Sequence, residues 1–304
     1  TFSTSPLPQA LKRHLETHYP GGIFHLVYEA GFCGFWICRT FRALGLDCIV
    51  VNAADIPTTN KDKDQKRDPV DSRKLARELS KGDLQCIFIP TEPDQHLRSL
   101  CRLYGCQVQN ATRVKNRIKG HLYFNGVDLP DHTSYWSGNF IAYLKTLPLD
   151  NGPAKDYLTF CLAELQQHRQ CMATVLRKLR YYVHQHQIDP TIRNLMTVFG
   201  IGFKSAIILH TEIIDINRFH SFDRLKSFAG LVPSTHSSGE TDNTRGLTHR
   251  RNGYLRWVLI EAAWVAIRHD PALLQSFNKL ISRMTKQDAI IRIAVKLLSR
   301  IRYV

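Results

Sequence analysis

The first 93 residues alternate between two patterns of hydrophobic and polar positions. Three short apolar runs between glycine-bearing or polar stretches predict strands, at residues 24–30, 47–52 and 85–90. Segments with apolar residues at helical spacing precede or separate them, at residues 8–19, 34–44 and 69–81. Strands and helices that alternate at these lengths predict an α/β layer with parallel strand pairing.

From residue 94 to residue 188, the apolar positions follow a helical period almost throughout. Two long basic helices are predicted, at 95–125 and 156–186, with a polar, proline-bearing connection at 126–153. This arrangement indicates an antiparallel coiled-coil arm that mediates oligomerisation, contacts nucleic acid, or does both. A plain helical linker domain fits the pattern equally well. The candidate nucleic-acid ligands of the first helix are Arg113, Lys115 and Arg117.

The third region, residues 189–304, begins with two glycines between helical patterns. Gly200 and Gly202 follow a predicted helix at 191–198 and precede one that carries Lys204. Without a Cβ, glycine lets backbone N–H groups approach an anion, and the next helix begins there with its positive dipole end. This is the arrangement of a helix-hairpin-helix, which grips nucleic-acid phosphates; an ordinary tight αα-hairpin also fits.

The rest of this region predicts a loop and two further helices. Residues 230–243 are rich in serine and glycine and predict a loop. An apolar helix follows, and residues 271–302 predict one long basic helix at the end of the chain. The predicted fold class is therefore α/β for residues 1–93 and all-α for residues 94–188 and 189–304.

Composition narrows the partners of this chain. Lys and Arg outnumber Asp and Glu by 41 to 26 in 304 residues, a net charge of +15 that suits a polyanion. The basic segment after the serine-rich loop adds Arg245, Arg250 and Arg251 to the candidate nucleic-acid ligands. No run of about eighteen apolar residues is present, so a membrane span is not expected. No signal peptide is visible, and we expect a cytosolic protein.

The eight cysteines do not indicate a metal site. None of them forms a CxxC pair, and most lie in apolar helix or strand patterns. We expect reduced core cysteines and no zinc.

Three carboxylates carry the candidate metal chemistry. Glu29 lies at the end of a predicted strand, where the active-site groups of open α/β sheets gather. Asp68 and Asp71 lie three residues apart at the start of the helix predicted at 69–81, so they share one face of that helix. Carboxylates brought together repel one another unless a cation lies between them, and Mg²⁺ prefers oxygen ligands. The alternative is structural, with Asp68 capping the helix that Pro69 opens.

A candidate nucleophile lies in the serine-rich loop, which contains Ser234, Ser237 and Ser238 ahead of several arginines. A serine attacks phosphorus when its proton is removed and the developing charge is held by a metal or by cations. Serines in glycine-bearing loops are also common turn formers, and spacing alone does not separate the two interpretations.

Several segments of the chain resemble those of a known family. The N-terminal segments YEAGFCGFW, VVNAADIP, KRDPVDSRKLARELSKGDL and RVKNRIKGHLYFNG are similar to the DEDD, RuvC-like domain of a family of insertion-sequence transposases. FGIGFKSAIILHTEIIDINRF, SFAGLVPSTHSSGET and NGYLRWVLIEAAW resemble that family's serine-containing transposase domain. The resemblance covers nearly the whole chain in the right order. It implies a RuvC-like (RNase H-like) domain, a coiled-coil arm and a helical transposase domain.

The resemblance also implies the activity. Members of this family are recombinases guided by a bridge RNA from their own element, and they exchange strands between donor and target DNA. It assigns metal binding to Glu29, Asp68 and Asp71, and the nucleophile to Ser238, with Ser237 as the alternative. It implies a homo-oligomer, dimer or tetramer, in which metal and serine from different domains form a composite site.

One departure from the family pattern matters. The family's first aspartate lies on an N-terminal strand with a G-I-D pattern, whereas this sequence begins TFSTSP. We expect a truncated sequence. Two other functions stay open: a degenerate, non-catalytic nucleic-acid-binding protein, and a RuvC-like nuclease without serine chemistry.

Overall fold

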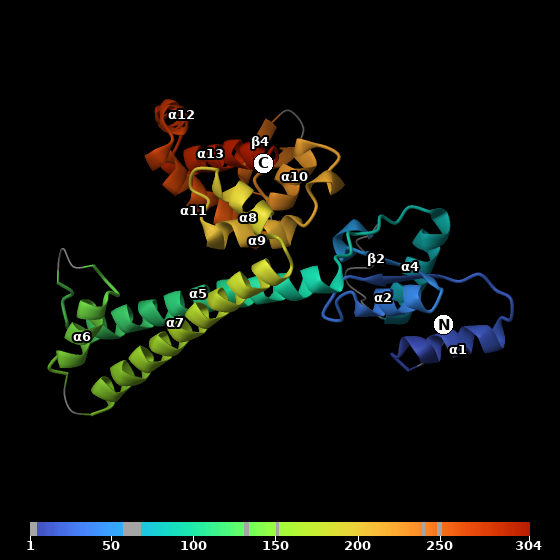
Figure 1. The fold of residues 1–304 in the computed structure, drawn as a ribbon, viewed down its shortest axis with the longest axis horizontal. Coiled ribbons are helices and arrows are strands. Elements are labelled where there is room, and N and C mark those ends of the chain that lie inside the picture. Colours follow the sequence, from blue (N-terminus) through green and yellow to red (C-terminus); the bar gives the residue numbers. More distant parts are fainter. Residues whose placement is uncertain (1–4, 57–67, 131–133, 150–151, 239–240, 248–250) are drawn as a thin grey trace. The chain divides into compact units, whose positions relative to one another are not determined.

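The computed structural model describes residues 5–56, 68–130, 134–149, 152–238, 241–247 and 251–304, of which 68–69 and 233–247 are described by their backbone alone (Figure 1). The chain divides into two compact units, Thr1–Pro90 and Thr91–Val304. The first unit is an α/β layer and the second is mainly helical. None of the described helices is both long enough and apolar enough to cross a membrane.

Unit 1 is built around two parallel strands. Strand β1 (His25–Glu29) pairs with β2 (Asp47–Val51), with Val27 opposite Ile49, as predicted. Helix α2 (Trp36–Ala43) is the crossover between them, and its buried Cys38 and Phe41 pack with alternate residues of β2. The remaining elements are α1 (Pro8–His18), the short η1 (Ala53–Asp55) and α4 (Asp68–Lys81).

The strand expected at residues 85–90 is absent from the described sheet, so that prediction is wrong. Cys86 forms a single antiparallel bridge with Val51, and the Ile87 amide donates to the Val50 carbonyl at 2.8 Å. Ile87 and Ile89 pack against the core of unit 1. The apolar positions of residues 85–90 therefore reflect side chains that cover the core of unit 1. A single bridge is enough to hold the segment there, without the repeated hydrogen bonds of a strand.

Unit 2 begins with an antiparallel helix pair, as predicted. Helices α5 (Glu92–Phe124) and α7 (Pro153–Gln185) lie side by side (Figure 1). Arg117 pairs with Glu164, and His121 bonds the carbonyl of Ala154, so the helices run in opposite directions. The expected loop between them contains a helix, α6 (Gly138–Thr146), which Ser137 caps. It forms because Phe140 and Leu144, one turn apart, are buried against the pair.

The rest of unit 2 packs around one central helix, α11 (Gly253–His269). Small residues of α11, among them Ala262, Ala263 and Ala266, are almost fully buried and allow close approach. Its main neighbours are α9 (Phe203–Ile213), α12 (Pro271–Ile281) and α13 (Lys286–Ile301). The remaining described elements are α8 (Asp189–Met196), η2 (Ile216–Arg218) and α10 (Phe222–Ala229).

The long last helix expected at 271–302 is two helices, so that prediction is wrong. The hydroxyl of Thr285 accepts the Asp288 amide at 3.1 Å and donates to the Asp288 carboxylate at 2.7 Å. The Thr285 hydroxyl thus satisfies an amide that the start of a new helix leaves open, so α13 starts at Lys286 and not in the middle of a longer helix.

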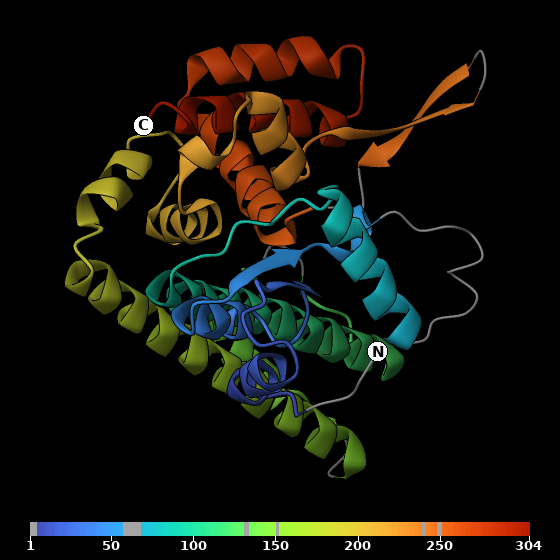
Figure 2. The same ribbon diagram turned by 90° about the vertical axis from the view of Figure 1, so that its right-hand side faces the viewer.

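The loop expected at residues 230–243 is largely an antiparallel hairpin. Strand β3 (Pro233–Ser238) pairs with β4 (Thr241–Leu247), with His236 opposite Asn243 and Ser238 opposite Thr241. Two residues separate the strands, and the first is glycine, which short hairpin connections favour. Figure 2 shows the hairpin extending away from the neighbouring helices of unit 2.

Candidate functional site

In unit 1, Glu29 is the last residue of β1, as the sequence predicted. Its side chain is exposed and makes no ion pair with a described residue. Asp71 lies in the first turn of α4, a helix that packs against β1, and it is half-buried. The side chain of Asp68 lies outside the described residues. The structure thus brings the elements that carry Glu29 and Asp71 together.

The chemistry of these residues fits a hard cation. Free carboxylates at the carboxyl end of a parallel strand supply the oxygen ligands that Mg²⁺ prefers. Among the described side chains, no three His, Cys, Asp or Glu residues gather into a metal-binding group. Of the three predicted ligands, the structure describes the side chains of Glu29 and Asp71.

Side chains of β1, α2 and β2 pack together in the core of unit 1. The Tyr28 hydroxyl donates to the Gly34 carbonyl at 2.8 Å, and burial raises the pKa of Tyr28 to about 12. The Cys38 thiol donates to the Cys48 carbonyl at 3.1 Å. Four of the eight cysteines are buried, as expected of core residues, whereas Cys86 and Cys106 are exposed, so the core prediction is wrong for these two.

The candidate nucleophile lies on the hairpin. Ser238 ends β3 and pairs with Thr241, and Ser237 pairs with Asp242. Arg245 lies on β4. The side chains of all five lie outside the described residues, as does Arg250, whereas Arg251 is described and exposed.

Both ends of the hairpin are held at one place in the fold. Gly230, at φ +68°, ends α10 just ahead of β3, and a Cβ there would lie 2.4 Å from Cβ of Arg251. The Arg256 guanidinium donates through Nε to the Gly230 carbonyl at 2.8 Å. The backbone amide of Asn252 donates to the Phe228 carbonyl at 3.0 Å. The start and the return of the hairpin are therefore fixed side by side at the first turn of α11.

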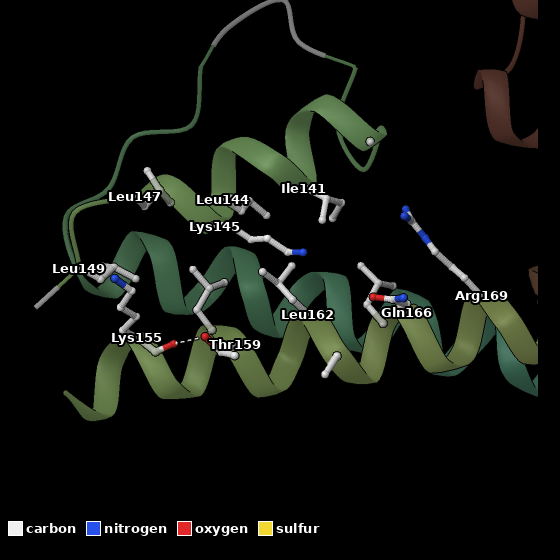
Figure 3. Close-up of a pocket in the computed structure, with 14 residues that line it drawn as sticks. Ile141, Leu144, Lys145, Leu147, Leu149, Lys155, Thr159, Leu162, Gln166 and Arg169 are labelled. Atoms are coloured by element: carbon white, nitrogen blue, oxygen red, sulfur yellow. Dashed lines mark hydrogen bonds between the residues drawn. The ribbon is translucent and has the colours of Figure 1, made fainter. Parts of the chain in front are cut away.

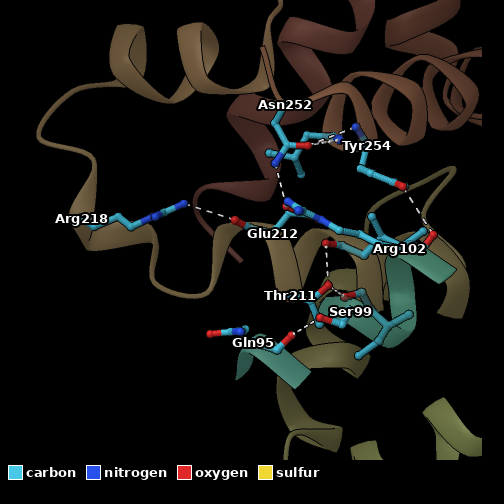
Figure 4. Close-up of polar contacts among 11 residues, drawn as sticks. Gln95, Ser99, Arg102, Thr211, Glu212, Arg218, Asn252 and Tyr254 are labelled. Carbon is cyan, nitrogen blue, oxygen red and sulfur yellow. Dashed lines mark hydrogen bonds and ion pairs between the residues drawn. The ribbon is translucent and has the colours of Figure 1, made fainter. Parts of the chain in front are cut away.

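A buried carboxylate lies beneath this point (Figure 4). Glu212 of α9 is fully buried and accepts two hydrogen bonds from Arg102 of α5, at 2.7 and 2.9 Å. Asn252 donates to the same carboxylate at 2.7 Å. The hydrogen bond to Glu212 raises the pKa of Arg102, while desolvation lowers the pKa of the neighbouring Arg98.

The sequence reasoning missed this network, although a signal was present. Glu212 is a lone carboxylate in the apolar run SAIILHTEII. A charge in such a run is buried, and a buried charge requires a partner of opposite sign. The partner itself could not have been identified, because Arg102 lies 110 residues away.

The two glycines of the predicted helix-hairpin-helix have different roles. A Cβ at Gly200, where φ is +87°, would lie 2.2 Å from the Ala262 carbonyl oxygen. Gly202 precedes the first residue of α9, and nothing lies within 4 Å of the Cβ position there. Lys204, in the first turn of α9, is exposed, and no described residue forms an ion pair with it. Close packing on α11 thus explains Gly200, whereas Gly202 and Lys204 face open space.

The candidate ligands of the arm already have partners within it. Arg117 forms an ion pair with Glu164 of α7 at 2.5 Å, and Arg113 donates to the Asn110 side chain at 3.2 Å. The Lys115 ammonium lies 5.8 Å from the centre of the Trp136 ring, and desolvation lowers its pKa. These three cations therefore make contacts within the arm itself.

A groove near the α6 end of the arm carries further cations (Figure 3). It has a volume of about 480 Å³ between α6 and α7, and its apolar lining includes Leu144 of α6 and Leu162 of α7. Lys145, Lys155 and Arg169 also line it. Arg169 donates to the Trp136 carbonyl at 2.6 Å, which ties α7 to the segment that leads into α6.

Two family models match the chain, one in its C-terminal part and one in its N-terminal part. A model of the Transposase IS116/IS110/IS902 family matches residues 192–278. A second model, described as a transposase and named for DEDD proteins of IS110, matches residues 8–125. The first match includes α9, the serine-bearing hairpin and α11, and the second includes β1, α4 and α5.

Curated relatives cover most of the chain. The putative transposase y4qE of Sinorhizobium fredii is 29% identical over 82% of this chain and 60% of its own length. The putative transposase y4rJ of the same organism is 27% identical over 90% and 74%. The transposase for insertion sequence element IS1111A of Coxiella burnetii is 24% identical over 80% and 66%. The chain thus spans between three fifths and three quarters of the length of these relatives.

Proposed function

Because this chain belongs to the IS110/IS116 family of transposases, we propose that it cleaves DNA and exchanges strands between an insertion element and its target, guided by an RNA. The observation that carries the proposal is the placement of Ser238 on a hairpin whose two ends are fixed to α11. A nucleophile needs this kind of support, because small displacements of a reacting group reduce the rate strongly.

The serine supplies covalent catalysis. The Oγ of Ser238 attacks a DNA phosphorus, the bond from phosphorus to the 3′ oxygen breaks, and that oxygen leaves with a proton as a 3′ hydroxyl. The product is a 5′ phosphoserine link. A 3′ hydroxyl from the partner strand then attacks this link, which joins the strands and returns the proton to Ser238. The number of phosphoester bonds is conserved, so the exchange requires no external energy source.

The carboxylates hold a divalent cation. Glu29, Asp68 and Asp71 would bind Mg²⁺ through oxygen ligands, which is the chemistry expected of a DEDD-type domain. When bound, the ion would stabilise negative charge on phosphate oxygens. The parallel β1–β2 pair with its crossover helix supports a RuvC-like (RNase H-like) fold for unit 1.

Nucleic acids are bound through an excess of positive charge. A net charge of +15 favours binding to a polyanion, and we propose DNA and a guide RNA as the ligands. Gly202 and Lys204, at the exposed start of α9, present a backbone amide and an ammonium to a phosphate. Base pairing with the RNA would select the target.

The arm extends this surface and joins protomers. The exposed cations of α5 and α7 are proposed to contact the nucleic-acid backbone, and the antiparallel pair to support a dimer or a tetramer.

A strand-exchange assay tests the proposal. The full-length protein, its guide RNA, Mg²⁺ and end-labelled donor and target DNA are combined, and recombined product and protein–DNA adduct are measured. We expect Ser238→Ala to abolish both while DNA binding is retained, and Ser237→Ala to leave both largely intact. Unchanged recombination in Ser238→Ala, or products with free 5′ phosphates and no adduct, would contradict serine catalysis and favour hydrolysis by a RuvC-like site.

A further inference from the structure

The first turn of α11 is the meeting point of three parts of unit 2. The hairpin returns to it through Arg251, its outgoing end is held to it at Gly230, and α5 contacts it from the arm. We propose that Arg102, Glu212 and Asn252 are positioning residues that hold the base of the serine-bearing hairpin to α5. This inference rests on the function proposed for Ser238.

The Glu212 carboxylate is fixed from two sides. The Arg102 guanidinium donates to Oε1 at 2.7 Å and to Oε2 at 2.9 Å, which is a bidentate pair. The Asn252 side chain adds a donor to Oε2 at 2.7 Å. Because the Glu212 side chain is only 1% exposed, solvent does not replace a lost partner. The carboxylate therefore links α5 directly to the residue that precedes α11.

Asn252 is held through both its backbone and its side chain. Its Oδ1 accepts the amides of Tyr254 and Leu255, each at 3.1 Å, and so caps α11. Its own amide donates to the Phe228 carbonyl at the end of α10. Asn252 follows β4 closely in the chain, so the hairpin returns to a residue that is held through its backbone amide, its backbone carbonyl and its side chain.

Helix α5 approaches α11 closely at the same level. A Cβ at Gly105 would lie 2.6 Å from the Tyr254 ring, so a larger residue at 105 would require the ring or the helices to shift. The Tyr254 hydroxyl donates to the Arg102 carbonyl at 3.4 Å, and the Arg102 guanidinium lies 5.5 Å from the centre of the Tyr254 ring. A shift of α5 therefore displaces the first turn of α11.

The outgoing end of the hairpin follows the same turn. Arg256 donates to the Gly230 carbonyl through both Nε and Nη2. Gly230 has a positive φ and no room for a side chain against Arg251. Both ends of the hairpin are thus tied to residues 251–256, and Asn252 and Tyr254 in this stretch contact α5 through Glu212 and Arg102.

Two conservative variants of the full-length protein test this coupling. Arg102→Lys keeps the charge and loses the bidentate geometry, and Asn252→Ser keeps a capping oxygen and loses the donor to Glu212. Arg300→Lys is the matched control, because Arg300 pairs with another buried carboxylate, Asp270, which lies at the opposite end of α11 from Asn252. For each variant, amide hydrogen exchange at residues 233–247, DNA affinity and the single-turnover rate of adduct formation are measured.

We expect both network variants to speed exchange in the hairpin and to slow adduct formation by about tenfold, with DNA affinity unchanged and Arg300→Lys like wild type. Equal behaviour of Arg102→Lys and Arg300→Lys, or a loss of DNA affinity that accounts for the lower rate, would overturn the inference. If Arg102→Lys does not fold, Asn252→Ser decides. If Ser238→Ala still forms an adduct, the proposed function fails, and hairpin exchange alone decides whether the coupling exists.

Discussion

Gly200 lies so close to Ala262 that a Cβ on the glycine would be 2.2 Å from the alanine carbonyl oxygen. The contact joins the turn between α8 and α9 to the central helix α11, which also carries the base of the serine-bearing hairpin. The glycine-bearing turn is therefore part of the packing of unit 2.

The first prediction concerns this contact. Gly200→Ala places a Cβ against the α11 backbone at a φ of +87°, so we expect the free energy of unfolding to fall by about 3 kcal/mol. Gly202→Ala is the control, because open space surrounds that position, and we expect a change of about 0.5 kcal/mol or less. Urea denaturation measures both. Equal loss in the two variants would contradict the distinction.

A second prediction separates binding from packing among the cations. Lys204 has no ion-pair partner among the described residues, whereas Lys226 of α10 pairs with Asp223. If Lys204 contacts a phosphate, Lys204→Ala lowers the slope of log affinity against log salt concentration by about 0.9 for duplex DNA. We expect Lys226→Ala to leave the slope unchanged. Titrations of labelled DNA at several salt concentrations provide the test, and an unchanged slope for Lys204→Ala would remove it from the interface.

A third prediction uses the pKa of Asp270. This buried carboxylate pairs with Arg300 and caps α12 through the amides of Ala272 and Leu273, and the hydrogen bond from Arg300 lowers its pKa. A depressed folded-state pKa stabilises the fold above the unfolded value of about 3.9, and the contribution is lost as the pH falls through the folded value.

The Asp270→Asn variant checks this sign. Asparagine keeps an oxygen for the cap and loses the ion pair, so we expect a loss of about 1–3 kcal/mol in unfolding free energy at pH 7. The difference from wild type should shrink when the pH falls below about 4. Urea denaturation at several pH values measures it, and a difference that is constant with pH would show that the pair contributes nothing.

The fold shows which features a sequence pattern can specify. The apolar runs that became β1 and β2 predicted both strands, and the helical pattern between them predicted their parallel pairing. The same signal at Ile87 and Ile89 overpredicted a strand, since periodicity reports burial and does not report pairing. The hairpin at 233–247 was missed because its strands contain few apolar residues.

The candidate site was predictable to a similar degree. Glu29 follows from its place at the end of a strand, and the role of Gly200 in packing could not be seen without its partner 62 residues away. The break before α13 does have a local signal, Thr285 followed by Asp288, which outweighs the helical spacing around it.

A fourth prediction addresses the proposed metal ligands. Glu29→Gln removes one exposed carboxylate charge without a described structural partner, so we expect the fold and DNA affinity to be retained. If Glu29 binds Mg²⁺, the rate of DNA cleavage should fall by about a hundredfold or more. Single-turnover cleavage at increasing Mg²⁺ concentration is the measurement, and wild-type rates at every concentration would exclude Glu29 as a ligand.

The most direct test of serine catalysis is the identity of the residue joined to DNA. The full-length protein is reacted with guide RNA and a donor DNA whose second step is blocked, and the adduct is digested and sequenced by mass spectrometry. We predict a nucleotide linked through phosphate to the Oγ of Ser238. A nucleotide on any other residue, or cleaved DNA with no linked peptide, would contradict the account.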